Sequence, residues 1–210
     1  MALVSRAYTP TEAAAVSGVA VKSVHNAIDK RIVAPRASGR SGRALSDDDL
    51  LRIKLWYGVG SILTAERRKR LFDHIDEHPD AATVRADDYL IVDVARAREQ
   101  LAERAHALLE AEDMIETNKG ILGGEPVFRH TRIPVRAIAA IASQGADKNE
   151  ILDGYPALNA RMVDLAEIWT TAHPARGRPR TLAEMGEKWK SEKRVALPKS
   201  PKTTTSGGNP

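Results

Sequence analysis

The sequence contains no cysteine, which excludes a disulfide framework, a thiol nucleophile and a zinc site with cysteine ligands. Aromatic residues make up only 4% of the 210 residues, which disfavours a large β-sandwich and favours small helical units packed through Ala, Leu and Val. No apolar run approaches the ~20 residues of a membrane span, and no basic stretch followed by an apolar run marks a secretion signal. We therefore expect a cytoplasmic protein with one or two domains and no membrane segment.

The net charge of +4 is distributed unevenly along the chain. Residues 1–45 hold seven basic and two acidic side chains, residues 46–172 hold 16 basic and 23 acidic ones, and residues 173–210 hold nine and three. Two basic ends thus flank an acidic middle. This pattern indicates polyanionic or acidic partners for the ends, unless the charges are only a solvated surface.

The sequence predicts a mainly α fold that begins with a winged helix-turn-helix at residues 1–60. The segment Thr9–Glu12 has the residues of a capping box with proline at the first helical position. Gly18 can adopt the left-handed turn before a second helix, expected from about Val21 to Lys30. Residues 32–45 alternate arginine with glycine and serine, which suits a short wing that follows a phosphate backbone.

Residues 61–113 are expected to form a helical connector or dimerisation region. The pattern predicts a helix at about 64–78, a short strand at 89–92 and a long helix at about 94–114. The long helix has an apolar stripe, which we expect to pack against a second copy of the chain or against the C-terminal domain. The members of this stripe are Leu101, Ala105, Leu108 and Leu109.

Residues 114–173 are expected to form a small hairpin followed by three helices, again similar to a helix-turn-helix. Asp147 and Asn159 are placed to cap the second and third of these helices. Residues 174–210 are rich in Pro, Lys and Arg, and this composition predicts a basic flexible tail.

No constellation of residues indicates catalysis. His74 and His78 have the i, i+4 spacing of a helical metal-chelating pair, but no third ligand is marked. The sequence lacks a phosphate-binding glycine loop and a nucleophile elbow. We expect a protein that is not an enzyme and that binds no metal or cofactor.

Residues 7–57 resemble MerR-type winged-helix DNA-binding domains. The resemblance rests on the segment Tyr8–Ala14, the turn at Ser17–Val19 and the arginine-bearing wing before Ser46–Leu50. It implies a second helix in the major groove of operator DNA and a wing on the backbone. The cysteine ligands of metal-sensing members are absent. The implied DNA-binding residues are Lys22, Ser23, His25 and Asn26 on the helix and Arg36, Arg40 and Arg43 in the wing.

A second resemblance covers about residues 114–172. The segment Gly123–Val135 is similar to the signature GG-x-P-V-x-R-G-T-R-I-P-V, and Glu150–Pro156 is similar to EEIL-x-x-YP. His130 stands where the family often has glycine. The family is catalogued as a domain of unknown function and is associated with VapB-type antitoxins encoded beside PIN-fold ribonuclease toxins. Arg129 and Arg132 belong to this signature. They can have a structural role, in which they tie the hairpin to helix ends, and no role in binding.

Together the two resemblances imply an antitoxin that inhibits a PIN-fold ribonuclease and represses its own operon as a homodimer. A guanidinium placed among the carboxylates of such a nuclease would displace its metal ion. The residues expected to bind the toxin are Arg176, Arg178, Arg180 and Trp189. Two alternatives remain open. The protein can be a MerR-like regulator without a toxin, and the tail can be a basic segment that has no function or that only adds non-specific affinity for DNA.

Overall fold

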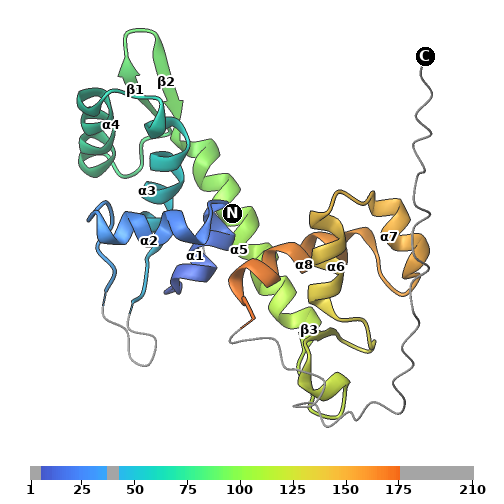
Figure 1. Ribbon diagram of the computed structural model, residues 1–210. Coiled ribbons are helices and arrows are strands. Elements are labelled where there is room, and N and C mark those ends of the chain that lie inside the picture. Colours follow the sequence, from blue (N-terminus) through green and yellow to red (C-terminus); the bar gives the residue numbers. More distant parts are fainter. Residues whose placement is uncertain (1–5, 37–42, 176–210) are drawn as a thin grey trace, which may run out of the picture. The chain divides into compact units, whose positions relative to one another are not determined.

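A computed structural model of the protein describes residues 6–36 and 43–175. Over these residues the fold consists of eight α-helices and two two-stranded antiparallel hairpins (Figure 1). The prediction of a mainly helical protein is therefore confirmed. The described residues belong to one compact unit that extends over Met1–Arg176. The finer division into segments 1–60, 61–113, 114–173 and 174–210 stays a prediction.

The first two helices form a tight pair around a glycine turn. Helix α1 (Pro10–Ser17) begins with the expected capping box, in which Thr9 and Glu12 satisfy each other's backbone N–H groups. Gly18 ends it with φ of 73°, a left-handed conformation that glycine adopts without a steric penalty. Helix α2 (Val21–Asp29) follows and packs its buried Val24 and Ala27 against the core.

A narrow antiparallel ribbon leads from α2 to the third helix. Arg36 pairs with Ala44, and Tyr8 pairs with the next residue, Leu45. Helix α3 (Asp47–Tyr57) then starts at Ser46, whose side chain forms a capping box with Asp49. These backbone pairs fix the two ends of the expected wing.

The connector region holds more strand than the sequence predicts. A 3-10 turn at Val59–Ser61 precedes helix α4 (Ala65–Glu77), which is capped by Thr64. Strand β1 (Thr83–Asp87) then pairs with strand β2 (Leu90–Asp93). The expected strand at 89–92 corresponds to β2, whereas β1 has no counterpart among the predictions.

Helix α5 (Val94–Met114) has the predicted bounds and runs through the middle of the fold (Figure 1). Helices α1, α3 and α8 pack against it. Its apolar stripe is therefore covered from within the chain, with Leu101, Ala105 and Leu108 buried and Leu109 half-buried. Of the two predicted partners for this stripe, the C-terminal helices supply the contact, and no second copy is needed to cover it.

In the C-terminal part, α8 and strand β3 pack against α5, and α6 and α7 pack against α8. Phe128, Ile138, Leu165 and Trp169 form the core of this part. Asp147 caps α7 in a capping box with Glu150, and Asn159 caps α8, both as predicted. The elements are strands β3 (Ile115–Glu116) and β4 (Val127–Phe128), the 3-10 turn Leu122–Gly124, and helices α6 (Val135–Ser143), α7 (Lys148–Gly154) and α8 (Ala160–Ala172).

Candidate nucleic-acid interface

Helix α2 exposes a polar face opposite its buried residues. Val24 and Ala27 are fully buried, whereas Lys22 and His25 are exposed. Ser23 and Asn26 are half-buried at the side of the same face. With 3.6 residues per turn, these four polar residues lie on the half of the helix that points away from the core. The structure thus brings together the four helix residues that the sequence marks for DNA contact.

The ribbon after α2 adds two exposed arginines. Arg36 and Ala44 exchange both backbone hydrogen bonds, each with an N···O distance of 2.9 Å. The side chains of Arg36 and of Arg43, which precedes Ala44, are exposed. Arg40 lies outside the described residues. The two described arginines therefore flank the loop that the sequence assigns to the wing.

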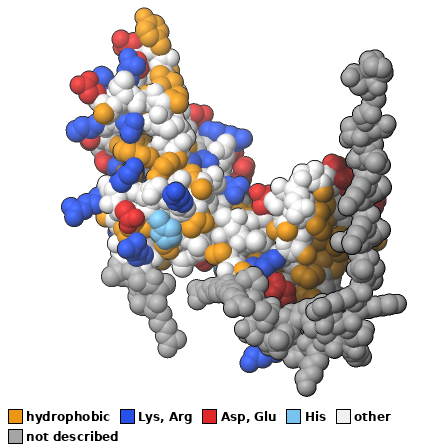
Figure 2. All heavy atoms as spheres, viewed as in Figure 1, with side chains coloured by type: hydrophobic (Ala, Val, Ile, Leu, Met, Phe, Trp, Pro, Cys, Tyr) orange, Lys and Arg blue, Asp and Glu red, His pale blue; other side chains and the backbone are white. Residues whose placement is uncertain are grey.

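The end of α2 carries two further basic residues that are not among the predicted DNA contacts. Lys30 and Arg31 are both exposed, and Arg31 has a positive φ of 55°. The backbone N–H of Ile32 donates to the carbonyl of Ala27 at 2.8 Å, which closes the turn after the helix. These two residues add exposed basic charge at the end of α2, next in sequence to the segment expected to form the wing. In Figure 2, Lys, Arg and His side chains gather on the surface over α2, with few acidic ones between them.

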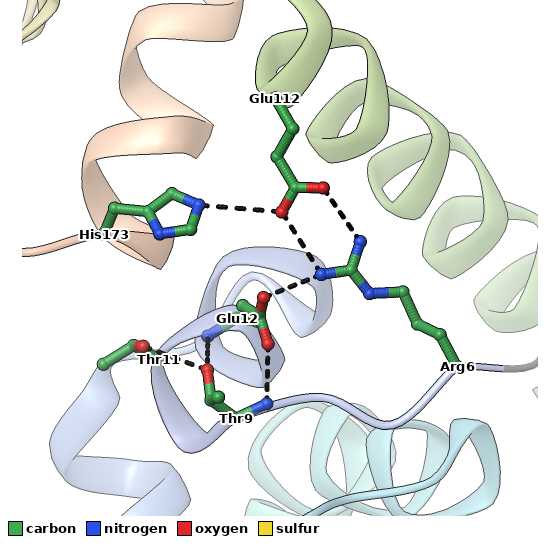
Figure 3. A network of polar contacts seen from close by, with 6 residues as sticks. All are labelled: Arg6, Thr9, Thr11, Glu12, Glu112 and His173. Carbon is green, nitrogen blue, oxygen red and sulfur yellow. Dashed lines mark hydrogen bonds and ion pairs between the residues drawn. The ribbon is translucent and has the colours of Figure 1, made fainter. Parts of the chain in front are cut away.

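A polar cluster attaches the start of the predicted winged helix-turn-helix (residues 1–60), called the head below, to helix α5 (Figure 3). The Arg6 guanidinium donates to Glu12 at 2.7 Å and to Glu112 of α5 at 3.0 Å. The hydrogen bond to Glu112 raises the pKa of Arg6 above its usual value, so Arg6 keeps its charge. The Nε2 atom of His173, which follows α8, lies 3.6 Å from the Glu112 carboxylate.

The same Glu12 carboxylate closes the capping box of α1. Its second oxygen accepts a hydrogen bond from the Thr9 backbone N–H at 2.7 Å. Helix α1 is also held from α5, because the Arg104 Nε atom donates to the Ala15 carbonyl at 2.8 Å. The helix that supports α2 is thereby attached to α5 at two places.

The signature of the second resemblance forms a structural turn. The Arg129 backbone N–H donates to the Met114 carbonyl at 2.8 Å, and the Arg129 guanidinium lies 3.7 Å from Asp113. These contacts tie the turn to the end of α5. They agree with the alternative in which Arg129 has a structural role. His130 has a φ of 63°, so the left-handed turn persists where the family often has glycine. Arg132 is exposed.

The residues expected to bind a toxin, Arg176, Arg178, Arg180 and Trp189, all lie outside the described residues. The His74 and His78 rings are 4.7 Å apart between centroids, as a helical i, i+4 pair should be. Within residues 6–36 and 43–175, however, no group of three His, Asp or Glu side chains is arranged to hold a metal ion. None of the helices in this part of the chain is long and apolar enough to cross a bilayer.

Comparison with known proteins assigns the C-terminal part to a family. Residues 115–167 match the family described as Protein of unknown function (DUF433), and this span contains both segments of the second resemblance. Over 212 residues the chain is 30% identical to a protein of Sinorhizobium fredii (strain NBRC 101917 / NGR234) described as uncharacterized protein y4eO. That match covers 93% of this chain and 96% of the relative. No solved structure matches the chain.

Proposed function

This chain belongs to the same family as the y4eO protein and contains a DUF433 domain, and from that premise we propose that it is an antitoxin of a type II toxin–antitoxin system. In this proposal its N-terminal head, with MerR-like winged-helix architecture, binds operator DNA and represses its own operon. Its C-terminal part inhibits a PIN-fold ribonuclease, as in VapB-type antitoxins.

The polar face of α2 is the observation that carries the DNA-binding half of the proposal. An exposed helix face with Lys22 and His25 next to Asn26 offers donors and acceptors to base edges in a major groove. Arg36 and Arg43 supply charge on the flanking ribbon for phosphate contacts, which set affinity but not sequence preference. A polar helix face followed by a basic ribbon is the arrangement that winged-helix proteins use.

The inhibitory half of the proposal rests on the resemblance of Gly123–Val135 and Glu150–Pro156 and on the basic segment after α8. PIN-fold nucleases hold Mg²⁺ in a cluster of carboxylates. An arginine can pair with two carboxylate oxygens at once, and it would exclude both the metal ion and the RNA. Arg176, Arg178 and Arg180 are the candidates for this contact.

A cavity favours the alternative of a MerR-like regulator without a toxin. Its volume is about 320 Å³, and helices α3, α4 and α5 line it. Its apolar lining includes Leu51, Leu55 and Phe72. Its charged lining consists of Asp48, Asp49, Arg52, Asp76 and Arg98. Such a mixture of apolar surface and a few charged groups is typical of small-molecule sites, and a regulator would use it for an effector.

Two measurements separate these functions. The chain is co-expressed with the protein encoded next to it, and any complex is purified and assayed for ribonuclease activity. The antitoxin proposal expects that neighbour to be a PIN-fold ribonuclease and the complex to be stable and inactive. A mobility-shift assay with the upstream DNA tests the head, and the double change Lys22→Ala/Asn26→Ala should abolish the shift. The matched control is Glu66→Ala on the exposed start of α4, which should leave it intact. Operator binding without any complex would favour the regulator.

A further inference from the structure

The cavity of about 320 Å³ between α3, α4 and α5 has an excess of negative charge. Three carboxylates line it: those of Asp48 and Asp49 in the first turn of α3 and that of Asp76 near the end of α4. Two guanidiniums, those of Arg52 and Arg98, also line it. Among the described residues the lining therefore has one more acidic group than basic groups.

The protein itself engages both of these guanidiniums. The Arg52 guanidinium forms an ion pair with Asp76 and lies over the Phe72 ring, 5.0 Å from the ring centroid. The Arg98 guanidinium donates to two backbone carbonyl oxygens in the segment 79–81, one of them at 2.8 Å. An anionic ligand would have to compete with these contacts, so the two arginines are poorly placed to attract one.

The start of α3 supplies the negative charge that remains. Ser46 donates to Asp49 through its backbone N–H at 2.9 Å and through its hydroxyl at 2.8 Å, and both hydrogen bonds end on the same Oδ2 atom. The capping box thus leaves the Oδ1 atom of Asp49 unused. Asp48 is exposed. Burial raises the pKa of Asp47, and the charge of Asp48 raises it further, which indicates a negative potential at this helix end.

The remaining lining of the cavity is apolar. Leu51 and Leu55 come from α3, Phe72 and Ile75 come from α4, and Pro79 follows α4. Such a surface favours a hydrocarbon or aromatic group, because its burial removes apolar area of both partners from water. The volume is near the lower end of the range for small-molecule sites, so the ligand has to be small.

We propose that this cavity binds a small organic cation in which an ammonium or guanidinium group is attached to a compact apolar body. The cationic group donates charge-assisted hydrogen bonds to Asp48 and Asp49, and the apolar body lies between α3 and α4. This inference goes beyond the antitoxin proposal and does not depend on it. For the alternative, a regulator without a toxin, it names the chemical class of the effector.

Three probes with the same apolar body test the charge of the ligand: phenethylammonium, phenethyl alcohol and phenylpropionate. Each is titrated into the isotope-labelled full-length chain at low salt, and the chemical shifts of the backbone amides report binding. We expect the ammonium probe to bind about tenfold more tightly than the alcohol, because hydrogen bonds to charged groups are the stronger ones. We expect the propionate to bind more weakly than either. The shifted amides should include those of Leu51 and Phe72.

Variants then test the two parts of the cavity separately. The double change Asp48→Asn/Asp49→Asn should remove the preference for the ammonium over the alcohol. Asparagine is itself a good capping residue and keeps an oxygen that can accept the Ser46 N–H, so α3 should stay capped. The matched control is Asp88→Asn, at an exposed carboxylate in the β1–β2 turn that does not line the cavity. Ile75→Phe fills the cavity and should abolish binding of both probes.

Several outcomes would overturn this site. They are equal affinities for the three probes, tightest binding of phenylpropionate, and no saturable binding of phenethylammonium at millimolar concentration. If Asp88→Asn weakens the ammonium probe as much as the double variant does, net charge and not the cavity causes the binding, and the proposal is wrong.

The test uses neither DNA nor a toxin, so its failure is distinguishable from that of the proposed function. A chain that binds phenethylammonium but neither the operator nor a ribonuclease would retain the cavity site and refute the antitoxin. A chain that binds the operator and a ribonuclease but not the probe would do the reverse.

Discussion

Shortening Leu108 to alanine tests whether the apolar stripe of α5 is covered from within the chain. Leu108 is fully buried in the core to which α1, α3 and α8 contribute. Leu→Ala changes at such sites cost ~2.7–5 kcal/mol, because they combine lost transfer free energy with a residual cavity. Leu108 lies within a long helix against which several others pack, which leaves little room for collapse. We therefore expect the free energy of unfolding to fall by about 3–4 kcal/mol.

The assay is urea unfolding followed by circular dichroism, together with sedimentation velocity of the folded protein. The sedimentation profile should not change, because the stripe is already covered by helices of the same chain. Leu109→Ala is the matched control: its side chain is half-buried, so we expect a loss of only about 1 kcal/mol. A loss below about 1 kcal/mol for Leu108→Ala, accompanied by dissociation of a dimer, would refute the intramolecular packing.

Three further predictions concern the head, the tail and the buried phenol of Tyr8. Arg43→Ala should weaken binding to every DNA sequence and reduce the salt slope by about one unit, whereas Asn26→Ala should change which bases are preferred; fluorescence anisotropy against operator variants at several salt concentrations checks both. Arg178→Ala should weaken ribonuclease inhibition about tens-fold, and Arg178→Lys should restore it only in part; full inhibition by a chain that ends at Ala172 would contradict this. Burial raises the pKa of Tyr8 to about 12, so the folded state keeps a proton that the unfolded state loses from about pH 10. Stability should therefore be lost between about pH 10 and pH 12, by about 3 kcal/mol in all, and Tyr8→Phe should remove this loss in urea titrations.

Helix boundaries were predictable because their signals are local. The side chains of Thr9, Ser46, Thr64 and Asn159 each accept a backbone hydrogen bond three residues further on. A cap of this kind depends only on the next turn of the chain. Apolar spacing along a helix is also a local signal, and the bounds of the long helix α5 agree with those predicted from it.

Strand β1 could not be predicted in this way. Its buried residues are only Val84 and Ala86, separated by the exposed Arg85, and alanine has little preference for strands. The turn to β2 consists of Asp88 and Tyr89 and lacks the glycine that marks most two-residue hairpins. The left-handed φ of His130 was also unexpected, although histidine is among the residues enriched in that conformation.

Some features of the candidate site follow from local spacing, and others depend on long-range packing. The shared face of Lys22, His25 and Asn26 could be predicted, because helical spacing alone fixes their side of α2. The Arg6–Glu112 contact joins residues that are 106 positions apart in the sequence, so no local sequence pattern predicts it. Both side chains are charged residues of types that occur throughout the sequence, and only the packing of α1 against α5 identifies the pair.

Helix α1 did carry one long-range signal, and the structure explains it. Ala13, Ala14, Ala15 and Val16 are consecutive and all buried, whereas a helix with one apolar face would expose two of them. A helix that is apolar on every side must be enclosed, and here α2, α3, α5 and α8 all pack against α1. The small alanine side chains permit these close approaches. A free-standing winged helix would leave the side that faces α8 in water. The composition of α1 therefore agrees with its enclosure by these four helices, and the contacts of Arg6 with Glu12 and Glu112 attach α1 to α5 as well.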